Sequence, residues 1–308
     1  MTTGKALNGK PYAGNPHVRF DEGEVASAAT PRRGSLLYNM RKQTWRAAVS
    51  AAAICVAAVL PLGAKADTEY IEIRTVNDLK GITDNTKSYK LMADIDMQNT
   101  SWRIGGTFTG VFDGNGHTIS NIYCNNDWDN SGFFFALGDG AVVRNLSLRG
   151  GKVTTRNGYI GGLAGRVSGN VLIEDCTIDV LVSGGGYVGG FVGYVSNATL
   201  TLRRCRSLSA VVGGDRVGGF VAYPYGSAVV TVEDCYAAGS VKGSSWVGGI
   251  VGCPDGGGNS LLTISNSYSV AELTGCFGSP DERVGEFNSR VVIIDTPTNS
   301  FCGAATLI

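Results

Sequence analysis

The 308-residue sequence has little histidine and no closely spaced pair of cysteines. It contains two His, of which only His117 lies beyond residue 66, and none of its eight Cys belongs to a Cys-x-x-Cys pair. Structural zinc sites are usually built from such pairs together with His. The sequence therefore argues against a metal site, and we expect neither a metal nor a cofactor.

Proline is scarce as well, and the short apolar runs beyond residue 140 are nearly free of it. A Pro inside a strand would remove a donor from the β ladder, so these runs can pair continuously. Four of them share a phrase with two adjacent Gly, which recurs at intervals of 28, 29 and 30 residues. A fixed period of this length indicates one supersecondary unit stacked on copies of itself. The phrase occupies residues 160–165, 188–193, 217–222 and 247–252.

A second phrase keeps the same step and ends at Cys176, Cys205, Cys235 and Ser267, and a third apolar patch closes each unit. Three short runs rich in Val, Ile, Leu and Thr, separated by Gly, Ser, Asn and Asp, are typical of strands. Three strands in about thirty residues without a helix fit one coil of a parallel β-helix, whereas a propeller blade needs about 40 residues. The sequence therefore predicts an all-β parallel solenoid.

The repeat places Cys176, Cys205 and Cys235 at one position of successive coils. A disulfide or a metal site is the functional interpretation of such a column. We predict instead a stack of small buried side chains, because free Cys is among the most buried residue types. The pairing of the remaining cysteines after export stays open.

A secretory signal peptide is predicted at residues 40–66, starting at Met40 and cleaved after Ala66. Basic residues precede an apolar stretch from 47 to 60, and small residues stand at the cleavage site. The stretch is shorter than a membrane span requires. We interpret residues 1–39 as an over-extended start or as disordered, and we expect a secreted, periplasmic or cell-surface protein without a transmembrane span after cleavage.

Removal of residues 1–66 would make the chain acidic. That segment holds 9 of the 26 Lys and Arg but 3 of the 26 Asp and Glu, which leaves 17 basic and 23 acidic residues and a net charge of −6. An acidic surface argues against nucleic acid as a partner. The residues that remain are numerous enough for one solenoid domain.

The segment before the repeats is expected to close the end of the solenoid. Thr75–Ile82 is predicted as a short capping helix, with Thr75 as N-cap and Asp78 near the positive end of the helix dipole. Tyr89–Met97 is predicted as the first strand, and Phe108–Ile119 as two strands joined by a tight turn. We therefore predict a cap with the first coils at residues 67–130 and the repeats at residues 131–275. Residues 276–308 are predicted as an irregular C-terminal coil, complete or truncated.

The apolar-Gly-Gly phrases resemble the GLUG motif of secreted bacterial proteins. Leu91–Ile119 is similar to the segment that precedes such repeats, and the resemblance covers roughly residues 67–275. It implies a right-handed, pectin-lyase-like β-helix in an exported, adhesin-like surface protein, often of Bacteroidetes. Similar repeats also accompany IgA-protease-like metallopeptidases, but this sequence has no His-Glu-x-x-His motif. The family supplies no catalytic residues, so the resemblance implies no peptidase activity here.

Asp94, Asp96 and Asp113 are the best candidates for catalysis, which is considered because many β-helices act on polysaccharides. Hydrolysis needs two carboxylates that flank the scissile bond, and a lyase needs a base beside acidic calcium ligands. Alternation along a strand would place Asp94 and Asp96 on one face. Solvated polar faces and an Asp-Gly turn explain the same residues, and His117 is better explained as a partner of backbone groups. We predict no catalytic residue.

Two columns of flat side chains, one before and one after each Gly-Gly phrase, are the candidate binding residues. If they face solvent, aromatic faces and planar guanidinium groups offer a platform for a glycan or a peptide. If they are covered, they are ladders that stabilise the coils. The first column contains Tyr159, Tyr187, Arg216 and Trp246. The second contains Arg166, Tyr194 and Tyr223.

The sequence favours a secreted or cell-surface, adhesin-like protein that binds glycans, or host or bacterial surface proteins, through a stacked solenoid face without catalysis. A polysaccharide-active lyase or glycoside hydrolase of the pectin-lyase-like type is the alternative. A structural stalk or spacer is the third interpretation, and the exposure of the two columns distinguishes a binding protein from a stalk.

Overall fold

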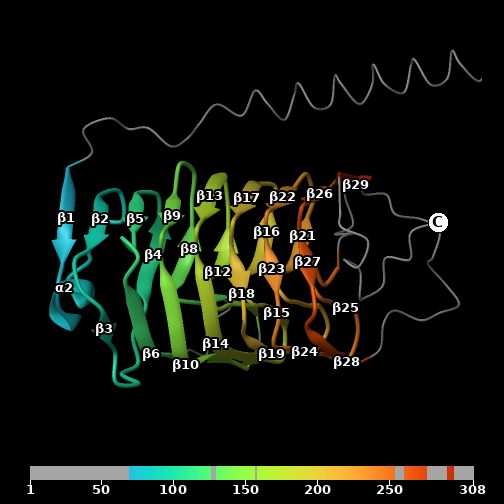
Figure 1. Cartoon of the computed structure of the whole chain (residues 1–308), viewed down its shortest axis with the longest axis horizontal. Coiled ribbons are helices and arrows are strands. Elements are labelled where there is room, and N and C mark those ends of the chain that lie inside the picture. Colours follow the sequence, from blue (N-terminus) through green and yellow to red (C-terminus); the bar gives the residue numbers. More distant parts are fainter. Residues whose placement is uncertain (1–68, 126–129, 157, 254–259, 276–289, 295–308) are drawn as a thin grey trace, which may run out of the picture. The chain divides into compact units, whose positions relative to one another are not determined.

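Figure 1 shows the computed structural model, which describes residues 69–125, 130–156, 158–253, 260–275 and, for the backbone alone, 290–294. The chain divides into two units after Leu60, and all described residues belong to the second, Pro61–Ile308. The predicted extension at 1–39, the signal peptide at 40–66 and nearly all of 276–308 lie outside the described residues.

Sheet A receives one strand from each successive coil, so its strands lie side by side in chain order (Figure 1). All pairings between described strands, in this sheet and in the three others, are parallel. The strands of sheet A are β1 (Tyr70–Ile73), β2 (Ser88–Leu91), β5 (Val111–Asp113), β9 (Val142–Arg144), β13 (Asn170–Glu174), β17 (Thr199–Arg203), β22 (Val229–Glu233), β26 (Leu261–Ser265) and β29 (Arg290–Ile294).

Sheet B follows sheet A around each coil. The central coils each contribute one long strand to this sheet, and the later coils each contribute two short ones. The last long strand pairs in register with both short strands of the next coil. The strands of sheet B are β3 (Ile95–Asp96), β6 (Thr118–Asn125), β10 (Ser147–Thr155), β14 (Thr177–Gly184), β18 (Arg206–Ser207), β19 (Ala210–Val212), β23 (Tyr236–Ala237), β24 (Ser240–Lys242), β27 (Tyr268–Ser269) and β28 (Glu272–Thr274).

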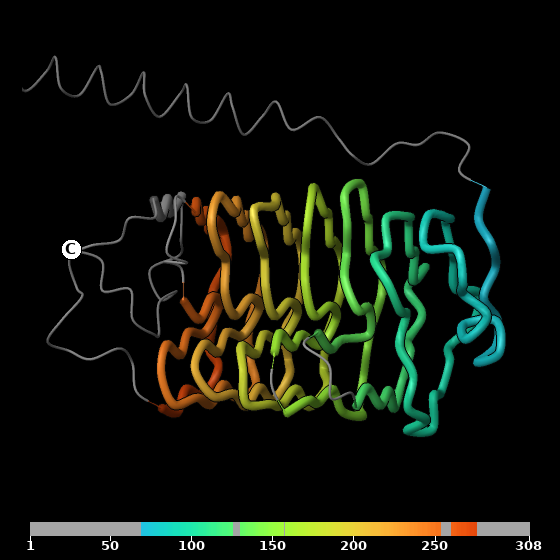
Figure 2. Tube along the Cα trace, turned by 180° about the vertical axis from the view of Figure 1, so that it is seen from behind, coloured from blue at the N-terminus to red at the C-terminus, as the bar shows by residue number. Residues whose placement is uncertain are grey.

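Sheets D and C complete the coil before the chain returns to sheet A. The strands of sheet D are β7 (Asn130–Ser131), β11 (Tyr159–Gly161), β15 (Tyr187–Gly189), β20 (Val217–Gly218) and β25 (Val247–Gly248). The strands of sheet C are β4 (Ile104–Phe108), β8 (Phe134–Leu137), β12 (Ala164–Val167), β16 (Val192–Ser196) and β21 (Val221–Tyr225). Figure 2 shows the resulting coils as stacked loops.

The register of the strands reproduces the period of the sequence. Gly161 pairs with Gly189, Gly189 with Gly218, and Gly218 with Gly248. Residues 28, 29 and 30 positions apart in the sequence are thus neighbours in space. The prediction of an all-β parallel solenoid with coils of about thirty residues is confirmed.

The Gly-Gly phrase makes the turn from sheet D to sheet C. A Cβ at Gly161 would collide with the carbonyl oxygens of Ala164 and Phe191, and a Cβ at Gly193 would collide with the backbone nitrogen of Ile160. The outer backbone faces of the two sheets approach too closely for any side chain, and Gly is the residue that permits this. Sheets C and D therefore fold back on each other.

A corner residue with positive φ follows each later strand of sheet A, and Asn and Asp adopt this conformation more readily than other non-Gly residues. The corner residues are Asn145, Asp175, Arg204, Asp234 and Asn266, with φ of 52°, 54°, 51°, 54° and 45°. The next residue of each coil is buried. These residues are Leu146, Cys176, Cys205, Cys235 and Ser267. The three cysteines are free, so the predicted buried column is confirmed.

Aromatic side chains fill the interior of the first coils. Phe108 and Phe112 pack against Phe133 and Phe134, with ring centroids 5.1 to 6.5 Å apart and mostly edge-to-face contacts. Later coils place Val, Leu and single Phe side chains in the same interior. The core is therefore continuous along the stack.

The predicted capping helix is confirmed as α2 (Val76–Lys80), which follows β1. The Thr75 hydroxyl accepts from the backbone N–H of Asp78 at 3.2 Å, and the Asp78 carboxylate accepts from the backbone N–H of Thr75 at 2.9 Å. This reciprocal pair is a capping box. Leu79 is fully buried and anchors the helix to the end of the core.

The prediction of one strand at Tyr89–Met97 is wrong. The segment forms β2 in sheet A and β3 in sheet B, with a corner between them at which the N–H of Met92 donates to the carbonyl of Ile73. Both sheets bury their apolar residues in one interior, so the apolar pattern continues around the corner and conceals it.

The two strands predicted at Phe108–Ile119 are parts of three. Phe108 ends β4 in sheet C, and β5 and β6 lie on either side of the predicted tight turn. Asn115 and Gly116 have positive φ in that turn, as the sequence predicted. The additional corner lies at Thr109 and Gly110, where the chain passes from sheet C to sheet A.

Candidate functional site

The two predicted columns lie on either side of the fold-back between sheets D and C. Tyr159 pairs with Tyr187 in sheet D, and the backbone of Arg216 continues that column, because the N–H of Val188 donates to its carbonyl. In sheet C, Arg166 pairs with Tyr194, and Tyr194 with Tyr223. Each column therefore advances by one residue per coil, as predicted.

The fold-back brings the two columns into contact, with an offset of one coil. Tyr159 stacks on Tyr194 of the next coil, with ring centroids 4.1 Å apart and an interplanar angle of 12°. Tyr187 meets Tyr223 of its next coil at 4.9 Å in an edge contact. Along the columns, Tyr159 lies 5.6 Å from Tyr187, and Tyr194 lies 5.7 Å from Tyr223. The rings thus form one interlocked group.

Two arginines belong to this group. The Arg216 guanidinium lies 4.4 Å from the ring centroid of Tyr223 and 4.8 Å from that of Tyr187, within the range of cation–π attraction. It also forms an ion pair with Asp215. Arg166 lies 5.9 Å from the Tyr194 ring. The arrangement places positive charge at both ends of the stacked rings.

Tyr225 extends the group and was not among the predicted residues. Its ring lies 5.8 Å from Tyr223 and 6.1 Å from Tyr194, and the residue is 40% exposed. It follows Tyr223 by two positions on one strand, so the period of two could have revealed it. We call the whole group the tyrosine–arginine cluster. Its members are Tyr159, Tyr187, Tyr194, Tyr223, Tyr225, Arg166 and Arg216.

The cluster is partly covered. Tyr194 is 9% exposed, and Tyr159, Tyr187 and Tyr223 are half-buried. Two of the ring contacts, Tyr159–Tyr187 and Tyr159–Tyr194, are face to face, so these rings cover part of one another. Trp246, the last predicted member of the first column, is half-buried and makes no ring contact with these tyrosines among the described residues.

Asp94 and Asp96 are exposed on either side of the buried Ile95, so they lie on one face, whereas Asp113 belongs to a different sheet. Asp113 is buried and accepts from Arg144 Nε at 2.9 Å, while Asp94 and Asp96 lie at the exposed end of another sheet. The backbone N–H of Thr118, together with His117, lowers the pKa of Asp94. The backbone N–H of Gln98, together with Asn121, lowers the pKa of Asp96. These carboxylates act as local acceptors that order turns.

The buried cysteine column donates its thiol hydrogens to backbone carbonyls. Cys176 Sγ lies 3.2 Å from the carbonyl of Glu174, and Cys235 Sγ lies 3.1 Å from that of Glu233. Burial raises the pKa of the Cys205 thiol well above its ordinary value. Among the described residues, no group of three or more His, Cys, Asp or Glu is arranged to hold a metal ion.

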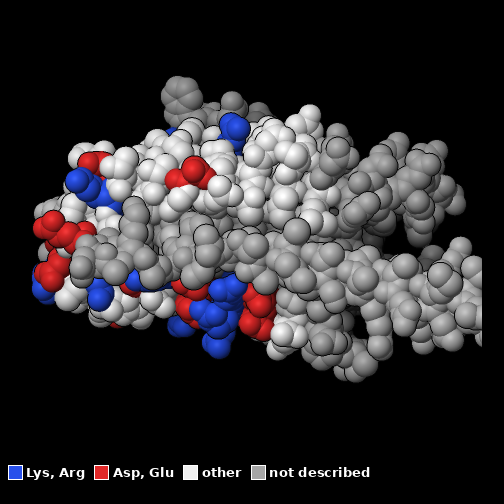
Figure 3. Space-filling view, turned by 90° about the horizontal axis from the view of Figure 1, so that it is seen from above, with Lys and Arg blue, Asp and Glu red and all other residues white. Residues whose placement is uncertain are grey.

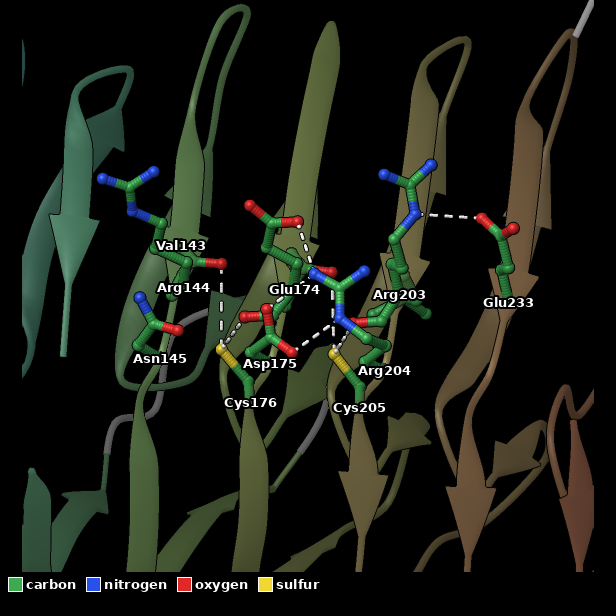
Figure 4. A network of polar contacts seen from close by, with 12 residues as sticks. Val143, Arg144, Asn145, Glu174, Asp175, Cys176, Arg203, Arg204, Cys205 and Glu233 are labelled. Atoms are coloured by element: carbon green, nitrogen blue, oxygen red, sulfur yellow. Dashed lines mark hydrogen bonds and ion pairs between the residues drawn. The ribbon is translucent and has the colours of Figure 1, made fainter. Parts of the chain in front are cut away.

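Charged side chains gather at the ends of the sheet A strands (Figure 4). Arg204 bridges Asp175 at 2.7 Å and Glu174 at 3.1 Å, and Arg203 pairs with Glu233 at 2.9 Å. Figure 3 shows a mixed group of basic and acidic side chains side by side at one edge of the view. We did not predict this network from the sequence. Its charged residues nevertheless occupy two fixed positions of the repeat, the corner residue and the residue just before it.

Comparison with known proteins supports the fold and gives little about the site. No protein-family model matches the sequence. An alignment 138 positions long, which covers 39% of the chain, is 32% identical to a halomucin of Haloquadratum walsbyi, and it covers 2% of that protein's length. The fold resembles a solved structure of a protein named as an immunoglobulin A1 protease from Bacteroides ovatus.

That structural likeness has a TM-score of 0.57 and covers 68% of each chain at 24% identity. At this identity it shows the fold alone. In the described part of the chain, no helix is both long and apolar enough to cross a membrane.

Proposed function

We propose that this chain is an exported surface protein that binds glycan chains, without catalysis, along the tyrosine–arginine cluster. The observation that carries the proposal is the gathering of five Tyr and two Arg from three successive coils into one continuous, half-exposed group. Tyr and Arg are the residues that dominate binding hot spots, because they combine large contact area with hydrogen-bonding groups.

The geometry favours a polar ligand that lies along the solenoid axis. The phenol hydroxyls of the partly exposed tyrosines can form hydrogen bonds with sugar hydroxyls. Within the cluster, Tyr225 is the most exposed ring and offers an aromatic surface for a sugar face. Because neighbouring coils are about 4.8 Å apart, successive sugar units of an extended chain can each meet a different coil.

Export is part of the proposal. The segment from residue 40 to residue 66 has the basic, apolar and small-residue parts of a signal peptide. The similarity of over a third of the chain to a halomucin supports a place at the cell surface. A binding role is preferred to polysaccharide cleavage because Asp113 is buried in an ion pair with Arg144, while Asp94 and Asp96 accept hydrogen bonds from neighbouring turn residues.

Affinity electrophoresis tests the proposed function. The protein would be run through native gels that contain a panel of microbial, plant and host polysaccharides, and we expect retardation in at least one. Tyr187→Ala should weaken that retardation about tenfold or more, because it removes a ring that contacts both columns. Thermal unfolding of the same variant would establish that it remains folded.

Free migration in every gel would contradict glycan binding and leave a protein-binding or purely structural solenoid. A cleared zone after staining for the polysaccharide would show depolymerisation and contradict the non-catalytic assignment. Retardation that Tyr187→Ala leaves unchanged would place the binding surface elsewhere on the solenoid.

A further inference from the structure

One column of sheet A alternates in charge through seven consecutive coils. Each member pairs in register with the next, and every step along the column changes the sign of the charge. The column then ends at Ser265, which pairs with the last charged member. Its members, in order, are Glu72, Lys90, Asp113, Arg144, Glu174, Arg203 and Glu233.

In the later coils, parts of the interior repeat from one coil to the next. Val188 pairs with Val217, and Val217 with Val247, so identical side chains recur at this level. The cysteine column and the Gly-Gly phrases repeat in the same way. Within these later coils, a chain that slipped by one whole coil during folding would therefore keep many of its apolar contacts, as a strand can slip where its pattern does not fix the register.

The charged column does distinguish neighbouring coils. In the native order, Arg144 Nε lies 2.9 Å from the Asp113 carboxylate, and Arg203 Nε lies 2.9 Å from the Glu233 carboxylate. A slip that leaves out one coil would place two like charges beside each other at the junction where the coil is missing. Like charges directly opposite each other on neighbouring strands are destabilising, whereas opposite charges stabilise the pairing.

We infer that this column specifies the order and the register of the coils, a task that the repeated parts of the interior cannot perform. It penalises the misaligned solenoid more than it stabilises the native one, which is how proteins exclude alternative pairings. The inference is independent of any ligand. It has a distinctive consequence, because loss of one coil breaks the alternation and loss of two coils preserves it.

A coil deletion combined with a charge exchange tests this consequence. Deleting residues 145–174 removes one coil and brings Arg144 beside Arg203. Adding Arg203→Glu with Glu233→Arg restores a fully alternating column in the shortened chain. In the intact chain the same two substitutions keep their mutual attraction but place a carboxylate at position 203 beside Glu174. One pair of substitutions is therefore favourable in one background and unfavourable in the other.

We expect the exchange to raise the Tm of the shortened chain and to lower that of the intact chain, by about 2 °C or more in each case. About 1 M NaCl should reduce both shifts, because the Debye length is then about 3 Å. Shifts of the same sign in both backgrounds, or no shift in the intact chain, would overturn the inference.

Single substitutions keep the test decisive if the shortened chain does not fold. Arg203→Gln removes the ion pair with Glu233, and Arg203→Glu in addition places three carboxylates in succession. The intact chain should lose more thermal stability with Glu than with Gln at position 203. Equal losses would contradict a role of charge order.

Discussion

Asp113 is a buried charged side chain of the first coils with several hydrogen-bond partners. It is 6% exposed, and its carboxylate accepts from Arg144 Nε at 2.9 Å, from Asn145 Nδ2 at 3.1 Å and from the backbone N–H of Asn115 at 2.8 Å. Arg144 in turn donates to the hydroxyl of Tyr70 in β1. The Asp113 carboxylate in β5 and Arg144 in β9 are thus connected to β1 at the capped end of the solenoid.

Asp113→Asn should lower the free energy of unfolding by about 2 kcal/mol or more, because Arg144 would lose its counter-charge at a site where its side chain is 27% exposed. Asp94→Asn is the matched control, since Asp94 is 74% exposed and an amide oxygen can still accept from Thr118. The control should change stability by about 0.5 kcal/mol or less. Equal effects in urea unfolding would contradict the role of Asp113.

The sequence presented Asp113 as part of an exposed Asp-Gly turn, and that interpretation was incomplete. The turn exists, but the pairing of β5 with β9 places Arg144 directly beside the carboxylate, thirty-one residues away in the chain. An ion-pair partner 31 residues away can be predicted only if the register between coils is known, and the first coils are too irregular for the sequence to reveal it. In the later coils the repeated glycines fix that register.

At the scale of the element, the Gly-Gly turn determines the site. It folds sheet C back on sheet D and brings the residues before and after the phrase into contact. The sequence predicted both columns and their members. It could not predict the contact between columns or its offset of one coil, because both follow from the close approach of two backbones at Gly161 and Gly193.

Gly190→Ala should destabilise the protein by about 1–3 kcal/mol, because a Cβ there would collide with the carbonyl of Gly219 and with the Ser207 hydroxyl. The Ser207 hydroxyl already donates to that carbonyl, at 2.5 Å, so neither atom can retreat easily. Thermal unfolding measures the effect.

Gly105 provides the matched control for this substitution. It also lies in a strand, β4, and a Cβ there would meet nothing within 4 Å. Gly105→Ala should be neutral or slightly stabilising, since Ala reduces the freedom of the unfolded chain. A Gly190→Ala variant as stable as Gly105→Ala would show that the turn tolerates side chains.

At the scale of the whole molecule, the protein is a stack in which each described coil contacts its immediate neighbours, so local features add along one axis. The apolar interior, the tyrosine–arginine cluster and the charged column run along that axis on different parts of the coil. The interior supplies stability, the charged column distinguishes the coils, and the cluster offers a surface that spans several of them.

We propose that glycan binds at this cluster and not at the other aromatic side chains of the described solenoid. Tyr225 and Tyr268 allow a direct comparison, because they are 40% and 39% exposed and lie in different sheets. Both also contact one or more neighbouring Tyr rings, but only Tyr225 belongs to the cluster. Their truncation should therefore perturb the fold to a similar extent.

The measurement is the dissociation constant for the retarding polysaccharide, determined for Tyr225→Ala, Tyr268→Ala and the unchanged protein. We predict that Tyr225→Ala weakens binding about tenfold, which corresponds to about 1.4 kcal/mol, and that Tyr268→Ala binds as the unchanged protein does. Equal affinities for the two variants, or a loss confined to Tyr268→Ala, would contradict the assignment of the cluster as the binding site.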